Sequence, residues 1–486
     1  MAKLTFKGLE RLGRRIDAAA DGRDAAALTA LDAEGAERCE TLTATAALGA
    51  SLWYFRSNIH AALQEISAPR TWDWRQPNRE RQILYLRRAA GHPSFIRLQP
   101  VVQAAICTNL ANSLSSLGRS LEAVALYDDA LKIVPNFAMA LGNKGMAMKS
   151  LLPYIPDPGH ARLIGAYACR LCRAANSPNV TWLTGNPAAE QQFADTADQL
   201  AKKIDIDKTI SRFPLDRPSL GATPEERAYR RWVLAEGLFL NPLLMLGPRP
   251  IAAADRLNLP SHMAPIGDPP EFISWFNQMK QEFVGARWFL YDARRLQDKH
   301  FADKHVGLVN TLDYPAFGLR IEQLRAAFRL GYGLLDKIAG FINAYYGLWL
   351  EATRVDIRNI WHEKKGVIRT PFIAKSNLQL RGLYWLAQDI VGDDPADQDS
   401  IAPEASHLKK LRNLLEHRCL VLREMDLGDP MGAVETETLH EFQASTFRIF
   451  RLARAALMYL AFSMKQEERA RRKEGEFAPA MRLPDL

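Results

Sequence analysis

The residues of this chain best suited to chemistry are Arg412, Asn413 and His417, which fall in a strongly helical segment near the C-terminal end. Histidine titrates near neutral pH and can take or give a proton, and a guanidinium presents a fixed fork of N–H donors to phosphate oxygens. An arginine, a polar neighbour and a histidine five positions on could therefore cleave a phosphodiester without a metal, provided that the helix exposes them.

The pattern of apolar residues predicts one helix over residues 403–425. At about 100° per residue, Asn413 and His417 lie one turn apart on the face opposite the apolar stripe, and Arg412 lies at the shoulder of the stripe. Leu420 and Val421 flank the histidine on its face, which suits contact with a partner surface. The stripe itself comprises Leu408, Leu411, Leu415, Cys419 and Leu422.

The spacing alone is weak evidence, because Arg87…His92 and Arg295…His300 share it. Only Arg412…His417 combines a polar second residue, an uninterrupted helix and a mainly polar face. Taken by themselves, the two residues are more simply interpreted as a solvated histidine and an ordinary helix-surface cation. Arg412 and Glu416 are one turn apart and could form an ion pair.

Composition favours a reduced, cytoplasmic globular protein. The 486 residues are 48% hydrophobic and 24% charged, and the net charge of +8 with a pI near 9.2 leans weakly toward polyanionic partners. The five cysteines are scattered; Cys169 and Cys172, the one close pair, have no second pair to complete a zinc site. No segment is typical of a signal peptide or a membrane span. No metal or cofactor is expected, and no membrane partner.

Residues 1–200 are rich in alanine and leucine and predict short helices. Residues 104–136 carry the 34-residue spacing of two antiparallel helices and resemble a tetratricopeptide (TPR) repeat. Another repeat begins near Ala138, and residues 48–66 are a weaker relative. Because one repeat cannot bury its own apolar face, an array of three or more is expected. The resemblance implies a groove for a peptide or protein ligand; packing against the rest of the chain is an equal alternative. The pattern positions are Leu110, Ala111, Leu114, Gly118, Ala123, Tyr127, Ala130 and Pro135.

The rest of the chain is also expected to be helical. Residues 201–310 predict a packed helical connector with helices at 227–240 and 271–296. Residues 311–470 predict a compact bundle with helices at 319–346, 378–390, 403–425 and 438–464, interrupted by an acidic loop over 392–399. A tail follows at 471–486. The fold class is all-α, with an N-terminal TPR-like array and a C-terminal bundle.

The second half of the chain resembles the HEPN superfamily, whose mark is an R-x4-6-H motif on a late helix of an α-bundle, here Arg412…His417. Other features are similar to a HEPN group found downstream of TPR arrays. The resemblance implies a metal-independent endoribonuclease that acts in bacterial antiphage defence or toxin–antitoxin conflict. In some HEPN toxins a tyrosine two positions after the histidine is adenylylated; this chain has Cys419 there. The similar features are Trp232 with residues 238–242, residues 335–338, residues 383–386 and the motif itself.

The chemistry assigns a role to each motif residue. His417 serves as acid or base for attack of the RNA 2′-OH, Arg412 stabilises the charge on phosphorus, and Asn413 orients the imidazole or a phosphate oxygen. Lys409 and Lys410 extend a basic rim for RNA, and a single-stranded loop is expected as the target because its bases can splay out. Because one histidine cannot serve as acid and base in one cycle, the resemblance implies a homodimer through the bundle. Asp336 and Lys337 are accessory candidates that a surface charge pair explains equally well.

A second function remains open from the sequence: a TPR scaffold or interaction protein whose helical bundle is catalytically inactive and serves dimerisation. A regulator that acts on DNA is a third and weaker possibility, because no DNA-reading motif is recognisable.

Overall fold

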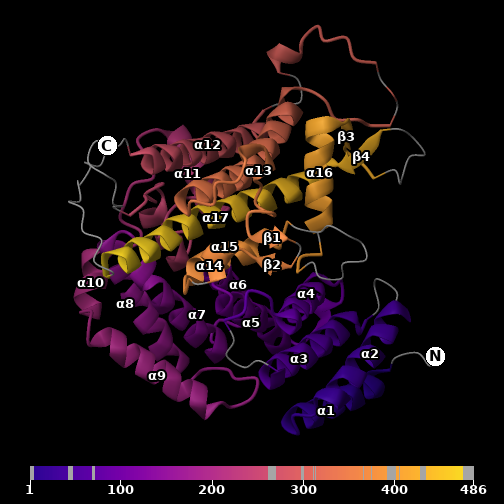
Figure 1. Ribbon diagram of the computed structural model, residues 1–486, viewed down its shortest axis with the longest axis vertical. Helices are drawn as coiled ribbons and strands as arrows, with labels where there is room; N and C mark the ends of the chain where they lie inside the picture. Colours follow the sequence, from indigo (N-terminus) through magenta and orange to yellow (C-terminus); the bar gives the residue numbers. More distant parts are fainter. Residues whose placement is uncertain are drawn as a thin grey trace. The chain divides into compact units, whose positions relative to one another are not determined.

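The computed structural model describes residues 5–41, 47–67, 72–260, 270–296, 300–309, 311, 313–364, 366–373, 375–390, 401–403, 405–426 and 434–473. Contacts between residues divide the chain into two compact units. Unit 1 comprises Met1–Pro153, Ala161–Phe213 and Val391–Ala405; unit 2 comprises Tyr154–His160, Pro214–Ile390 and Ser406–Leu486. Helices dominate both units and the strands are short, which confirms the all-α class (Figure 1).

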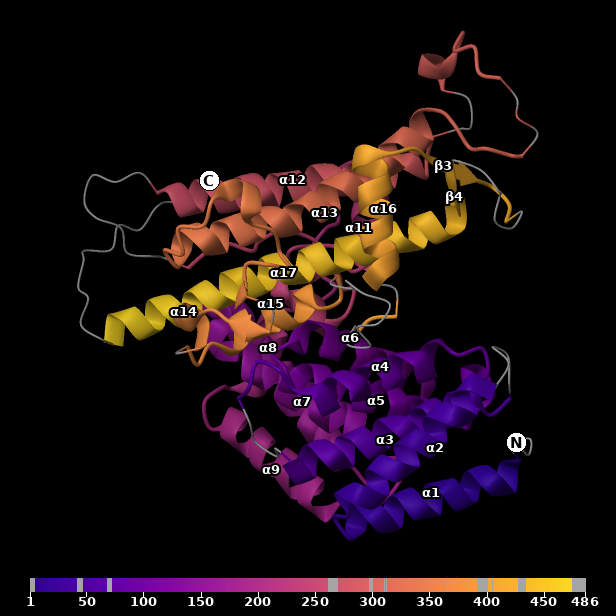
Figure 2. The same ribbon diagram turned by 45° about the vertical axis from the view of Figure 1, so that its right-hand side comes forward.

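Unit 1 is a succession of helices in which sequence neighbours pack side by side, as Figures 1 and 2 show for the indigo to magenta part of the ribbon. The acidic loop expected over 392–399 lies outside the described residues. The helices are α1 (Phe6–Asp21), α2 (Ala25–Thr41), α3 (Gly49–Ser67), α4 (Pro77–Gly91), η1 (Phe95–Arg97), α5 (Pro100–Ser116), α6 (Ser120–Ile133), α7 (Ala138–Leu151), η2 (Leu152–Tyr154), α8 (Pro158–Ala175), α9 (Pro187–Ala201) and α10 (Ile206–Arg212), with η2 and α8 crossing the unit boundary.

The helix pair predicted over residues 104–136 is confirmed as α5 and α6, which pack against each other, and α7 begins at Ala138 as expected. Ala111 and Ala123 are fully buried because small side chains let the two helices approach closely. Gly118 makes the turn with φ +87°, a conformation that favours glycine. Tyr127 fills the space between the helices, and its hydroxyl donates to Asn112 Oδ1 at 2.7 Å.

Residues 201–310, the expected connector, are divided between the two units after Phe213. The helix predicted over 227–240 is wrong at its end: α11 covers Pro224–Ala235, and Gly237, with φ +70°, turns the chain out of the helix. Two short turns of 3₁₀ helix follow, η3 (Pro242–Leu246) and η4 (Pro250–Ala252), before α12 (Glu271–Ala293). The buried Arg287 of α12 links this helix to residues 238–255. Its guanidinium donates to Asp255 at 2.7 and 2.9 Å and to the Leu238 carbonyl at 2.8 Å.

Unit 2 is built on three long helices, α12, α13 (Leu319–Tyr345) and α17 (Leu439–Lys473), that lie along one another in both views (Figures 1 and 2). The helix expected over 319–346 is confirmed almost to the residue. The other elements of the unit are η5 (Phe301–Asp303), η6 (Ala352–Arg354), β1 (His362–Lys364), β2 (Val367–Ile368), α14 (Thr370–Ile373), α15 (Leu378–Ala387), α16 (Ala405–His417), β3 (Leu420–Arg423) and β4 (Glu435–Thr438).

The helix predicted over residues 403–425 is wrong in its second half. Helix α16 ends at His417, and Leu420–Arg423 forms strand β3, which pairs in parallel with β4. On the other side of β3, the Leu422 carbonyl accepts a hydrogen bond from the Ala316 N–H at 2.7 Å. Burial alternates along the strand, so Leu420 and Leu422 face the core while Val421 and Arg423 do not. These contacts from residues distant in sequence outweigh the local helical preference.

Helix α17 is longer than the predicted 438–464 and includes the first residues of the expected tail. It continues because Glu467 and Glu468 are buried and have partners: Lys375 Nζ lies 2.7 Å from Glu467 Oε2, and the Tyr345 hydroxyl donates to Glu468 Oε1 at 2.7 Å. Residues 474–486 lie outside the described part. No helix in the described ranges is both long enough and apolar enough to span a lipid bilayer.

Candidate functional site

The motif residues lie on α16, which crosses the long helices of unit 2 (Figure 1). The helix is fixed by a buried stripe, and Asn413 and His417 are exposed on the opposite side, as the helical wheel predicts. Arg412 is half-buried at the shoulder of the stripe. Cys419 and Leu422, assigned to the stripe from sequence, are not on the helix. The buried residues are Ala405, Leu408, Leu411, Leu414 and Leu415.

The guanidinium of Arg412 lies against α13. Its Cζ is 5.9 Å from the centre of the Tyr332 ring, within the range of a cation–π contact. One of its N–H groups, on Nη1, donates to Asn413 Oδ1 at 3.2 Å. Among the described residues Arg412 forms no ion pair within 4 Å, so the pair with Glu416 that the helical spacing allows is not formed. The guanidinium is held in place, and most of its donors remain open.

His417 is the last residue of α16 and is exposed. Neither of its ring nitrogens bonds to a side chain or carbonyl in the described ranges, so the imidazole is open to solvent. Asn413 Oδ1, which was expected to orient the imidazole or a phosphate, instead accepts from Arg412. The expectation that Leu420 and Val421 form a partner-facing surface beside His417 is wrong for Leu420, which is buried as part of β3.

The basic residues of α16 face the acidic strand β4. Lys410 Nζ lies 2.7 Å from Glu435 Oε2, and His407 Nε2 lies 3.2 Å from Glu437 Oε1. The hydrogen bond to Glu437 raises the pKa of His407 against the opposing effect of burial. Lys409 is half-buried. The basic rim predicted from Lys409 and Lys410 is therefore partly neutralised, because Glu435 pairs with Lys410.

Asp336 and Lys337, the two accessory candidates on α13, have different partners in the structure. Lys337 pairs with Glu282 of α12, whereas Asp336 accepts the Ile357 N–H at 3.2 Å and lies one helical turn from Tyr332. Burial raises the pKa of Asp336, while the positive charges of Arg412 and Arg358 lower it. The helical spacing of residues 325, 332 and 336 places them on one face of α13, and this could have been recognised from the sequence. Only the tertiary structure shows that this face contacts Arg412 of α16.

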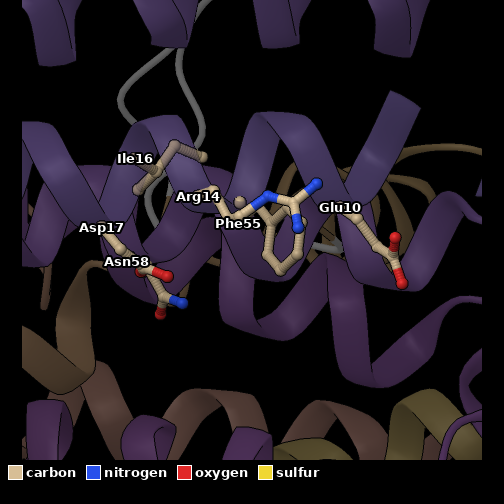
Figure 3. Close-up of a pocket in the computed structure, with 7 residues that line it drawn as sticks. Glu10, Arg14, Ile16, Asp17, Phe55 and Asn58 are labelled. Atoms are coloured by element: carbon tan, nitrogen blue, oxygen red, sulfur yellow. The ribbon is translucent and has the colours of Figure 1, made fainter. Parts of the chain in front are cut away.

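Other potential sites in the described ranges offer fewer groups that could bind a metal or act in catalysis. No group of three or more metal-ligating side chains is present in the described ranges. Cys169 and Cys172 are fully buried on α8, and burial raises the pKa of Cys172 to about 12. A pocket of about 300 Å³ in unit 1 lies between α1 and α3, and its lining contains no histidine, cysteine or serine (Figure 3). It is lined by Glu10, Gly13, Arg14, Ile16, Asp17, Phe55 and Asn58.

Residues 264–467 match the family described as LA2681-like HEPN. The C-terminal part of this chain is an LA2681-like HEPN domain. No curated protein and no solved structure matches the chain. The domain includes the similar features at 335–338 and 383–386, whose apolar members are core residues, whereas Trp232 and residues 238–242 precede the matched range. The polar residues of these features differ in burial from the apolar ones: Asp336 and Arg412 are half-buried, and Asn413 and His417 are exposed.

Proposed function

We propose that the HEPN domain is a metal-independent endoribonuclease. RNA supplies its own nucleophile, the 2′-OH, which attacks the adjacent phosphorus and expels the 5′-oxygen. The products are a 2′,3′-cyclic phosphate and a 5′-hydroxyl. His417 accepts or donates the proton, and the guanidinium of Arg412 stabilises the negative charge that develops on the phosphorane oxygens. Asn413 holds the guanidinium, and Lys409 and Lys410 guide the RNA backbone.

The observation that carries this proposal is the state of Arg412. Surface arginines commonly pair with carboxylates, but this one is held by an aromatic ring and an amide, with no carboxylate in contact among the described residues. Its open donors suit an incoming anion with the geometry of phosphate. His417, one turn beyond Asn413, is exposed and has no hydrogen-bond partner in the described ranges, so its ring nitrogens are accessible to a substrate. The HEPN family match supports the same assignment.

A homodimer completes the chemistry. The reaction needs one group to take the 2′-OH proton and another to protonate the leaving 5′-oxygen, and one imidazole does not do both at once. Two domains related by a two-fold axis would bring two motifs to one cleft. Unit 1, with its TPR-like helix pairs, would bind a peptide or protein that activates, inhibits or targets the nuclease. We place this activity in the cytoplasm, in bacterial antiphage defence or toxin–antitoxin conflict.

The proposal is tested with the full-length protein and a single-stranded RNA. Arg412→Ala should lower kcat/KM by about 10²- to 10³-fold and His417→Ala by about 10²- to 10⁴-fold. His440→Ala and Arg354→Ala are matched controls, because both residues are exposed and lie off the motif helix. The RNA ends should be cyclic phosphates; 3′-hydroxyl ends would reject this chemistry.

Expression in bacteria separates the nuclease from the scaffold alternative. The wild type should arrest growth, and the two motif variants should not. Equal tolerance of wild type, motif variants and controls, together with no cleavage in vitro, would favour a TPR scaffold with an inactive dimerisation bundle. Light scattering of the purified protein tests the homodimer independently of activity.

A further inference from the structure

One face of α13 runs alongside the motif. Arg325 Nη2 donates to the Leu420 carbonyl of β3 at 2.7 Å, and Tyr332, two turns further along α13, lies under the guanidinium of Arg412. Asp336 follows Tyr332 by one more turn on this face. The carboxylate of Asp336 therefore lies one helical turn beyond the ring that contacts Arg412, within electrostatic range of the guanidinium but not in an ion pair with it.

The environment of Asp336 leaves it ionisable but costly to ionise. Burial raises its pKa; the Ile357 N–H lowers it, Asp356 raises it, and Arg412 and Arg358 lower it. Burial, and after it the negative charge of Asp336, raise the pKa of Tyr332 to about 12. The neighbouring cation on its own helix, Lys337, is engaged by Glu282.

We infer that Asp336 is a positioning residue for Arg412: its negative charge, together with the Tyr332 ring, holds the guanidinium so that its open N–H donors face the phosphate. This inference rests on the proposed nuclease function for its catalytic consequence. It adds a residue of α13 to a motif that the sequence confines to α16.

The local structure by itself does not require a carboxylate at this position. An asparagine has nearly the same shape and could still accept the Ile357 N–H, which Asp336 Oδ1 accepts at 3.2 Å. It would also avoid the cost of ionising a half-buried carboxylate. What an asparagine cannot do is attract the guanidinium by charge. The variant Asp336→Asn therefore separates the packing role of this side chain from its electrostatic role.

For the full-length enzyme, Asp336→Asn should lower kcat by about tenfold or more, because a displaced catalytic group loses rate steeply with distance. KM for RNA should stay equal or fall, since removing a negative charge does not weaken phosphate binding. The wild type should lose activity at acid pH more steeply than the variant, because protonation removes the charge of Asp336 in addition to affecting the other catalytic groups. Glu351→Gln is the matched control, because Glu351 is an exposed carboxylate of unit 2 whose partner, Arg354, is also exposed. An Asp336→Asn enzyme with kcat within twofold of wild type would overturn the inference.

A second measurement does not depend on nuclease activity. Asp336→Asn and Arg412→Gln, singly and together, form a double-mutant cycle in urea unfolding. A shift of the unfolding midpoint in the double variant that differs from the sum of the single shifts supports the charge interaction; strictly additive shifts overturn it. Should the wild type cleave no RNA, the nuclease proposal falls, and this cycle alone decides whether Asp336 holds Arg412.

Discussion

Replacing Asp32 by asparagine should destabilise unit 1 strongly, because Asp32 anchors a buried polar network between α2 and α3. Arg56 donates to its carboxylate from Nε at 2.8 Å and from Nη2 at 3.3 Å, and His60 Nε2 lies 3.2 Å away. The side chains of Asp32 and Arg56 are only 15% and 8% exposed. Arg56 also donates to the Tyr85 hydroxyl at 2.7 Å.

The magnitude follows from the pKa of Asp32. Burial by itself raises this pKa, but hydrogen bonds from His60 and Arg56 outweigh it and lower the value from 3.8 to about 2. At about 1.4 kcal/mol per pKa unit, the ionised carboxylate stabilises the folded state by about 2 kcal/mol at neutral pH. Leaving Arg56 buried without its carboxylate can raise the cost to about 3–5 kcal/mol. We therefore expect Asp32→Asn to lose between about 2 and 5 kcal/mol at pH 7.

The pH dependence has a definite sign. Because the folded-state pKa is depressed, the contribution of Asp32 is fully present above pH 3.8 and is lost as the pH falls through about 2. The difference in free energy of unfolding between the wild type and Asp32→Asn should be constant from neutral pH to about pH 5 and should become smaller below about pH 4.

The assay is urea unfolding of the full-length protein, followed by hydrogen exchange of peptides from α3. Asp207→Asn is the control, because Asp207 is 94% exposed and pairs loosely with Arg170 at 3.4 Å; its effect should stay within about 0.5 kcal/mol. If Asp32→Asn behaves like this control, or if the difference does not narrow in acid, the network does not stabilise unit 1 in the way described.

Two further predictions concern packing and the site. A Cβ at Gly142 of α7 would lie 2.3 Å from the Phe193 ring, so Gly142→Ala should lower the free energy of unfolding by about 1–3 kcal/mol in urea. A Cβ at Gly285 of α12 would meet nothing within 4 Å, so Gly285→Ala should be neutral or stabilising in the same assay. His407→Gln should lower stability by under about 1 kcal/mol below pH 6.5 and have no effect once the pH rises above the raised pKa of His407, because only the imidazolium pairs with Glu437. A pH-independent effect of His407→Gln would mean that the ion pair is not its cause.

The sequence alone determined the helices whose apolar periodicity is long and unambiguous. Helix α13, the pair α5 and α6, and the start of α7 were predictable because their buried positions recur at helical spacing and small residues or turn-forming glycines mark their crossings. The outward direction of Asn413 and His417 was predictable for the same reason. The catalytic roles of Arg412, Asn413 and His417 stay predictions.

Tertiary structure decided the rest. Residues 420–423 fit a helix or a strand equally over so few positions, and backbone bonds from residues 314–316 and from β4 made them a strand. Three features of the site depend on residues that are far apart in sequence or lie on different elements. Arg412 has no carboxylate partner among the described residues, Lys410 pairs with Glu435, and the charge of Arg412 acts on Asp336. Local spacing contains no information about such pairs, because the packing of different elements, and not the sequence period, determines which charges meet.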